Sequence, residues 1–311
     1  MSEQRRFVIG VDGGGTKTNA ILVGLDGTVY AEAAGGPTNL ATVGTAKAAQ
    51  VLLDLFLECC ATAKAEPELL QNVVLGLAGA GRPAVRADLT DKLLAAAAKK
   101  KFPLKSIVVE TDARIALEAA FAGGPGVALI AGTGSIALYR TEDGKYLRAG
   151  GWGHVLGDEG SGYAIGRDGL QAVMRQFDGR GEKTLLTKKA FEHFGVSNVE
   201  ELIPKIYTEG ADIAAFAPRV FEAVVERDRP AHLILVKNAN DLTDHVRVLL
   251  MQARPRLKLP VCLMGGLLTH DNVYAKMVKE KIVASMPQVL ILRPKFPTPF
   301  GAAILGLNAF R

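Results

Sequence analysis

The sequence predicts an α/β protein made of two related halves, and two observations support this prediction. The order of strand, glycine-rich turn, strand and Asp-Gly turn begins at Phe7 and recurs over Gly126–Gly144. A repeat of one structural unit indicates a duplicated architecture. Of the 311 residues, 49% are hydrophobic and 34 are glycine, which suits large cores joined by tight turns.

The first turn follows the apolar run Phe7–Val11 and is preceded by Asp12. It comprises Gly13, Gly14, Gly15, Thr16 and Lys17. Glycines let backbone N–H groups approach an anion because no Cβ stands in the way, while Thr16 adds a hydroxyl and Lys17 a charge. At the end of its strand, Asp12 is placed to hold Mg²⁺ through the water shell of the ion.

The second turn follows the apolar run Val127–Ala131. It comprises Gly132, Thr133, Gly134 and Ser135. A structural hairpin turn would explain either turn alone, and neither is a standard nucleotide motif. Thr16 stands where a Walker loop has lysine, and the second turn lacks the third glycine of a dinucleotide fingerprint. The pair, in matched strand contexts, instead predicts two facing loops that hold the phosphates of a nucleotide.

Between the two turns the pattern predicts alternating strands and helices. Strands are expected at residues 28–34, 72–77 and 106–110, and helices at 44–64, 84–101 and 113–121. Asn39 lies in a Gly/Pro loop and by itself is an ordinary loop residue. Asp112 lies between a strand and a helix. It is either a helix N-cap, a role that Thr111 also suits, or a carboxylate at the edge where α/β sheets bind ligands; position alone favours the cap.

After the second turn, a return strand is expected at Ile136–Thr141, followed by a long loop at Ala149–Gly162. The loop is too rich in glycine for a regular element, and long loops of this kind are usually functional. Trp152, flanked by Gly151 and Gly153, offers an aromatic platform for a sugar, and Asp158 can accept hydrogen bonds from hydroxyls. Alternatively, Asp158 and Glu159 cap a helix that runs from Ser161 to Phe177.

The rest of the chain predicts helices over most of 164–253 and two more strands. The strands are expected at Leu259–Met264, which ends in the turn Gly265-Gly266, and at Val289–Leu292. Three prolines from 294 to 299 form a stiff connector. A final helix at Phe300–Phe310 is expected to pack back on the first domain. We therefore predict one domain of residues 1–118 plus 298–311 and another of residues 119–297.

Composition argues against several classes of protein. The net charge of +5 is scattered, without a basic stripe interleaved with aromatic residues, so we expect no nucleic-acid binding. No apolar run of about 18 residues is present, so no membrane-spanning helix is expected. Cys59, Cys60 and Cys262 have no metal-ligand spacing and suit a reducing compartment. The N-terminus, MSEQRRF, lacks the long apolar region and the cleavage site of a signal peptide, so a cytoplasmic protein is expected.

Taken in order, these motifs resemble the BadF/BadG/BcrA/BcrD-type ATPase family of the acetate-kinase, sugar-kinase, heat-shock-chaperone and actin superfamily, and within it the N-acetylglucosamine kinases. The resemblance covers nearly the whole chain. It is carried by the segments 11–18, 111–113, 132–135, 150–154 and 157–161. It implies two domains of a duplicated ribonuclease-H-like (actin-like ATPase) fold, with ATP in a central cleft.

The resemblance also implies roles for individual residues. The first phosphate loop would be Thr16 with its flanking glycines, the second Gly132, Thr133 and Gly134, and the adenosine motif Gly265 and Gly266. The amino sugar would contact Asn39, Asp112, Gly151, Trp152, Gly153 and Asp158. Asp112 would be the catalytic base. In one departure from the family pattern, Arg227-Asp228 stands where the family has Gly-Asp near the nucleotide.

The implied activity is ATP- and Mg²⁺-dependent phosphorylation of an amino sugar, N-acetylglucosamine at its 6-hydroxyl, by a homodimer. A glucosamine kinase or a muramic acid kinase remains open, because the sequence does not decide which sugar substituent fits. An ATPase that activates a radical dehydratase would need cysteines to hold an iron–sulfur cluster. A sugar-sensing regulator would need a DNA-binding segment, for which there is no room before Phe7.

Overall fold

The computed structural model describes residues 5–253 and 258–310 and forms two compact units. Unit 1 is the chain up to Gly124 together with the segment from Arg293 onward, and unit 2 is Pro125–Leu292. The sequence placed the boundaries at 118/119 and 297/298. The first would cut through helix α3 (Asp112–Phe121), and the second would separate Lys295, whose N–H donates to Ala120 O at 3.2 Å, from unit 1.

The sheet of unit 1 has five strands in the order β3-β2-β1-β4-β5. Its strands are β1 (Phe7–Gly13), β2 (Thr18–Gly24), β3 (Val29–Gly35), β4 (Leu70–Leu77) and β5 (Ile107–Thr111). The first three pair antiparallel as a meander, whereas β1, β4 and β5 run parallel. Each strand expected from the hydrophobic pattern is present. The parallel arrangement brings the carboxyl ends of β1, β4 and β5 to one edge.

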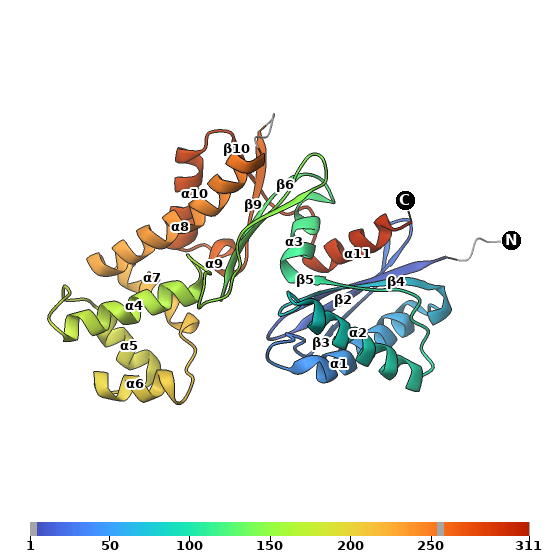
Figure 1. Ribbon diagram of the computed structural model, residues 1–311, viewed down its shortest axis with the longest axis horizontal. Coiled ribbons are helices and arrows are strands. Elements are labelled where there is room, and N and C mark those ends of the chain that lie inside the picture. The colour runs from blue at the N-terminus through green and yellow to red at the C-terminus, as the bar shows by residue number, and fades with distance from the viewer. Residues whose placement is uncertain (1–4, 254–257, 311) are drawn as a thin grey trace. The chain divides into compact units, whose positions relative to one another are not determined.

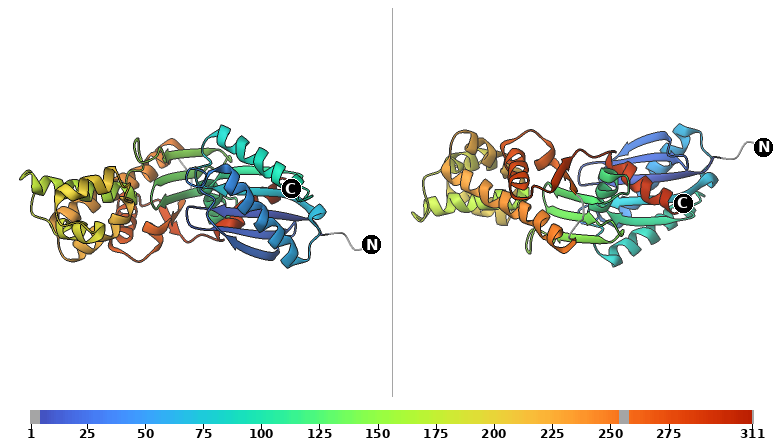
Figure 2. Two further views of the ribbon diagram at one scale, coloured as in Figure 1. Left: turned by 90° about the horizontal axis from the view of Figure 1, so that it is seen from below. Right: turned by 90° about the horizontal axis from the view of Figure 1, so that it is seen from above.

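Helices cover both faces of this sheet (Figures 1 and 2). One face carries α1 (Gly44–Ala63) and α2 (Pro83–Lys99), and the other carries α3 and α11 (Thr298–Asn308). The expected return of the last helix to the first domain is confirmed, although Pro299 belongs to α11 rather than to the connector. The approach is close, since a Cβ at Gly10 would lie 2.5 Å from the Ala303 nitrogen.

The sheet of unit 2 repeats this topology, with the order β8-β7-β6-β9-β10. Its strands are β6 (Gly126–Ala131), β7 (Ser135–Arg140), β8 (Tyr146–Gly150), β9 (Leu259–Met264) and β10 (Val289–Leu292). Again the first three are antiparallel, and β6, β9 and β10 are parallel. The prediction of two related halves is therefore confirmed. The sequence missed β8 and placed its last residues, Ala149 and Gly150, in the loop.

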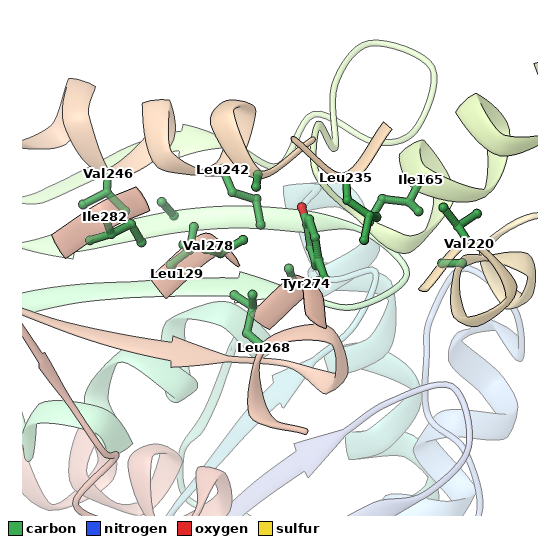
Figure 3. Close-up of a cluster of buried hydrophobic side chains, with 14 of the residues drawn as sticks. Leu129, Ile165, Val220, Leu235, Leu242, Val246, Leu268, Tyr274, Val278 and Ile282 are labelled. Carbon is green, nitrogen blue, oxygen red and sulfur yellow. The ribbon is translucent and has the colours of Figure 1, made fainter. Parts of the chain in front are cut away.

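The helices of unit 2 form its main core against this sheet. They are α4 (Gly162–Phe177), α5 (Leu186–Phe194), α6 (Val199–Tyr207), α7 (Ala217–Val225), α8 (Arg229–Ala253), α9 (Gly266–Thr269) and α10 (Val273–Ser285). Figure 3 shows Leu242 and Val246 of α8 meeting Val278 and Ile282 of α10 beside Leu129 of β6. The helical prediction for 164–253 is confirmed.

All three cysteines are buried and unpaired. Burial raises the pKa of Cys59 to about 12 and the pKa values of Cys60 and Cys262 to about 11. Thiols in such surroundings are inert toward metals and oxidants. No helix within residues 5–253 and 258–310 combines the length and apolarity needed to cross a membrane.

Candidate active site

The loop of residues 36–39 holds the first glycine-rich turn in place. The Gly14 carbonyl accepts the N–H groups of Thr38 and Asn39, both at 3.0 Å. Thr18, which follows the turn, donates its hydroxyl to Gly36 O at 2.7 Å and lies 2.8 Å from the Thr38 hydroxyl. These contacts turn the carbonyl of Gly14 inward, whereas Gly15, Thr16 and Lys17 are exposed. The exposed part is the surface of the turn that is open to a ligand.

Asn39, expected to contact the sugar, lies beside this turn. Its Oδ1 accepts the Ala41 N–H at 3.0 Å, and its Nδ2 lies 4.0 Å from the position that a Cβ on Gly15 would take. Because Oδ1 is already engaged, the amide NH₂ is the group that remains for a ligand. The structure thus brings the expected sugar residue next to the expected phosphate turn.

Asp12 is the second-last residue of β1 and Asp112 directly follows β5, so both lie at the carboxyl end of a strand in the parallel set of unit 1. Thr111 is the N-cap of α3, since its side chain accepts the Arg114 N–H at 3.2 Å. The cap interpretation of Asp112 is therefore wrong. Asp112 is the first helical residue and exposed, and its Oδ1 accepts the Ala113 N–H at 2.9 Å. A neighbouring residue has taken the structural role, which leaves the carboxylate available for chemistry.

The electrostatic surroundings couple these two carboxylates. Burial, followed by the negative charge of Asp112, raises the pKa of Asp12 to about 6, while Lys17 and a hydrogen bond from Thr298 oppose the rise. Desolvation by surrounding protein also raises the pKa of Asp112, although the residue is exposed. No local signal marks Thr298, which lies within the expected proline connector, and only the docking of α11 brings it to Asp12.

A pH dependence of stability follows from the raised pKa of Asp12. The folded state binds a proton more tightly than the unfolded chain, so stabilisation by the protonated form is complete below 3.8 and lost as pH rises through about 6. With a chelator present, we expect the free energy of unfolding to fall more steeply across this range in the wild type than in Asp12→Asn. Urea unfolding at a series of pH values measures both slopes, and equal slopes would contradict the assignment.

The second glycine-rich turn rests on the start of α4. The carbonyls of Gly132 and Thr133 accept the N–H groups of Gly162 and Tyr163 at 2.8 and 3.2 Å. Thr133 itself is exposed. Gly265, at the end of the neighbouring parallel strand β9, packs against Ala131, the residue before this turn. The expected second phosphate loop and the expected adenosine motif therefore lie side by side within unit 2, at the carboxyl ends of its strands.

The loop from Gly151 to Ser161 follows β8 and returns to the second turn. Trp152 is 64% exposed. The Asp158 carboxylate lies against the turn, because a Cβ at Gly134 would be 2.8 Å from its Oδ2. Burial raises the pKa of Asp158, and hydrogen bonds from the backbone of Ser135 and Gly153 offset part of the rise. Asp158 thus links the Trp152 segment to the second glycine-rich turn.

The helix after this loop is capped by neither of the expected acids. Ser161 is the N-cap of α4 and accepts the Ala164 N–H at 3.1 Å, so the cap interpretation of Asp158-Glu159 is wrong. The loop is anchored instead by contacts from distant segments. Tyr274 donates its hydroxyl to Gly160 O at 2.7 Å, and His245 Nε2 lies 3.6 Å from Glu159 Oε2. No local sequence signal marked Tyr274 or His245.

The Arg227-Asp228 pair has a structural explanation. Asp228 is 7% exposed, and its carboxylate accepts the Thr184 hydroxyl and the N–H groups of Leu185 and Ala231 at 2.9, 2.7 and 2.8 Å. Arg227 adopts φ +64°, a left-handed conformation in which a Cβ is strained. Glycine adopts this conformation without strain. Backbone geometry is therefore enough to explain a Gly-Asp pair at this place, without any ligand contact of residue 227.

Replacing Arg227 by glycine is therefore expected to stabilise the protein. Relief of left-handed strain, reduced by the greater freedom of an unfolded glycine, gives about 0.5–1 kcal/mol. Urea unfolding of the wild type, Arg227→Gly and Arg227→Ala measures this difference. The alanine variant removes the side chain and keeps the strain, so an equal gain in both variants would point to the arginine side chain instead.

The two sheets of equal strand order, each with a glycine turn after its first strand, define the duplicated ribonuclease-H-like fold found in actin-like ATPases and sugar kinases. A ROK hexokinase from Thermus thermophilus shares this fold with a TM-score of 0.56 at 16% identity. The match covers 97% of this chain and 99% of the hexokinase. Residues 9–306 match the BadF/BadG/BcrA/BcrD ATPase family. The chain belongs to that family.

Full-length relatives are amino-sugar kinases. An N-acetylmuramic acid/N-acetylglucosamine kinase of Clostridium acetobutylicum is 33% identical, over 97% of this chain and 98% of its own. An N-acetyl-D-glucosamine kinase of Dictyostelium discoideum is 31% identical, over 98% and 99%. A solved structure from Chromobacterium violaceum, assigned as an N-acetylglucosamine kinase, has a TM-score of 0.78 and 27% identity, with 98% and 100% covered.

Proposed function

We propose that this protein transfers the γ-phosphoryl group of ATP to the 6-hydroxyl of an amino sugar, with N-acetylglucosamine as the substrate. The observation that carries the proposal is end-to-end similarity to two amino-sugar kinases, 33% and 31% identical. The local chemistry supports it, because Asp112 is an exposed carboxylate freed from helix capping by Thr111.

The proposed roles divide between the units. In unit 1, Asp112 accepts the proton of the sugar hydroxyl and Asn39 contacts the sugar, while Gly13, Gly14, Gly15, Thr16 and Lys17 bind phosphate. In unit 2, Gly132, Thr133 and Gly134 bind phosphate, Gly265 and Gly266 bind adenosine, and Gly151, Trp152, Gly153 and Asp158 bind the sugar. Phosphoryl transfer needs positioning and charge stabilisation more than covalent chemistry, so backbone donors and a single base suffice.

Mg²⁺ belongs to this proposal as the ion that neutralises charge on the transferring phosphate. The residues fit such an ion, because burial and then the charge of Asp112 raise the pKa of Asp12, and a nearby cation would relieve the repulsion between the two carboxylates. Among the described residues, no three His, Cys, Asp or Glu side chains gather as a metal site. Mg²⁺ retains most of its waters and uses few carboxylates, so Asp12 would hold it through water.

The experiment is an ADP-release assay on the purified protein with N-acetylglucosamine, glucosamine, N-acetylmannosamine and N-acetylmuramic acid, with the product position read by NMR. We expect the 6-phosphate of N-acetylglucosamine. Glucosamine remains an alternative, since a glucosamine kinase of Vibrio cholerae is 28% identical over 84% of this chain and 85% of its own. The absence of sugar-dependent ADP release with every sugar would refute the kinase proposal.

The remaining parts of the proposal concern a rival activity, the cellular compartment and the oligomeric state. A dehydratase-activating role is disfavoured because Cys59, Cys60 and Cys262 are buried, where they cannot hold a cluster between subunits. Three unpaired thiols suit a reducing compartment such as the cytoplasm. A homodimer is proposed from the family resemblance, and light scattering of the purified protein tests it.

A further inference from the structure

A guanidinium group stacks on the one tryptophan of the chain. The Cζ atom of Arg148 lies 3.7 Å from the centroid of the Trp152 ring, well inside the range of a cation–π contact. Arg148 belongs to β8, the edge strand of the unit 2 sheet, and both residues are exposed. The glycines between them, Gly150 and Gly151, have φ values of +72° and +73° and turn the chain back so that the indole meets Arg148.

The charge of Arg148 is not compensated by a neighbouring acid. No ion pair to Arg148 occurs among the residues that the structure describes. Of the two acids of the following loop, Asp158 accepts hydrogen bonds from the backbone of Ser135 and Gly153, and Glu159 lies beside His245. An unpaired guanidinium therefore stands at the edge of the expected sugar platform.

Stacking leaves the hydrogen-bonding capacity of Arg148 intact. The N–H donors of a guanidinium lie in its plane, so an arginine that stacks on an aromatic ring still presents its fork sideways to a carboxylate. Carboxylates bind this fork through two parallel hydrogen bonds. A neutral amino sugar has no group that uses such a fork fully, whereas an amino sugar with a carboxyalkyl ether substituent does.

We propose that Arg148 is a specificity residue that binds the carboxylate of an acidic amino sugar of the N-acetylmuramic acid type seated on Trp152. The inference rests on the proposed function and narrows its substrate class: the site accepts both the neutral N-acetylated sugar and its 3-O-lactyl derivative. Trp152 supplies an apolar face to either sugar ring, and Arg148 adds affinity only for the charged one.

The test uses Trp152 as its own reporter, since it is the single tryptophan of the chain. Fluorescence titration without ATP gives dissociation constants for N-acetylglucosamine, N-acetylmuramic acid and the methyl ester of the latter. In the wild type, the acid is expected to bind more tightly than its ester. In Arg148→Met, binding of the acid weakens by roughly 10- to 100-fold, the range for hydrogen bonds to charged groups, and the difference between acid and ester disappears.

Two further variants separate the hydrogen-bonding fork of Arg148 from its charge and from the general effect of removing a cation. Arg148→Lys keeps the charge and loses the fork, so it should retain part of the preference for the acid. Lys145→Met removes an exposed cation from the same hairpin, where it pairs with Asp143 at 2.8 Å, and should leave all three dissociation constants unchanged. Neutral N-acetylglucosamine should bind Arg148→Met as it binds the wild type, because that sugar makes no use of the charge.

The outcomes separate this inference from the proposed function. If N-acetylglucosamine is phosphorylated but the acid and its ester bind equally to the wild type, Arg148 has no role in specificity and the inference is overturned. The same conclusion follows if Arg148→Met weakens all three ligands alike. If no amino sugar is phosphorylated and none changes the fluorescence, the kinase proposal itself fails.

Discussion

Replacing Asp112 by asparagine is expected to lower kcat by roughly 10²- to 10⁴-fold, the usual contribution of a general base. The amide cannot take the proton of the sugar hydroxyl, yet it preserves the size of the side chain. The fold should survive, because Thr111 rather than Asp112 caps α3. The ADP-release assay measures turnover, and Trp152 fluorescence measures sugar affinity, which should change little.

The matched control is Asp91→Asn, which changes an exposed acid on α2 of the same unit. Its turnover should equal that of the wild type. Turnover of Asp112→Asn at the level of this control would remove Asp112 from the role of base. A large loss of sugar affinity with little loss of kcat would instead make Asp112 a binding residue.

The second large effect is expected at Gly265, and its neighbour Gly266 serves as the control. Gly265 has φ +83°, and a Cβ there would overlap the backbone of Ala131, lying 2.7 Å from its carbonyl carbon. The Ala131 atoms nearest to this Cβ all belong to the backbone, so they cannot move aside as the end of a flexible side chain would. We expect Gly265→Ala to destabilise the protein by about 3 kcal/mol, from left-handed strain and overpacking together. Because Ala131 precedes the second phosphate turn, ATP affinity should also fall.

Gly266→Ala is the control for this prediction. No atom lies within 4 Å of the position that its Cβ would take, and the residue begins α9. Its stability should match the wild type in urea unfolding, and calorimetry with an ATP analogue measures the loss of affinity in Gly265→Ala. If the two variants behaved alike, the close approach of β9 to the end of β6 would not be a constraint on this turn.

The repeated topology was predictable because it depends on local patterns. Apolar runs of strand length, interrupted by turn residues in the same order, appear twice along the chain and produced two sheets of the same strand order. The strand β8 was missed for a physical reason. It is a short edge strand, Tyr146–Gly150, whose charged and glycine residues read as loop until β7 pairs with it.

The site was only partly predictable, because its local signals were ambiguous. Position favoured a capping role for Asp112, and the composition of the Trp152 loop allowed one for Asp158. The structure assigns both caps to neighbouring hydroxyl residues, Thr111 and Ser161. A hydroxyl and a carboxylate are both good N-caps. Which of several nearby residues takes the role depends on how the chain before the helix is held by the rest of the fold.

The sequence by itself determined the two halves, their glycine turns and the acids beside them, since each depends on residues close together along the chain. Only the tertiary structure decided which polar groups are occupied and which remain free for a ligand. Tyr274 reaches Gly160 across 114 residues, and α11 returns Thr298 to Asp12 from the far end of the chain. Such contacts form only when separate elements pack together, so the sequence around one partner does not indicate which distant residue it will contact.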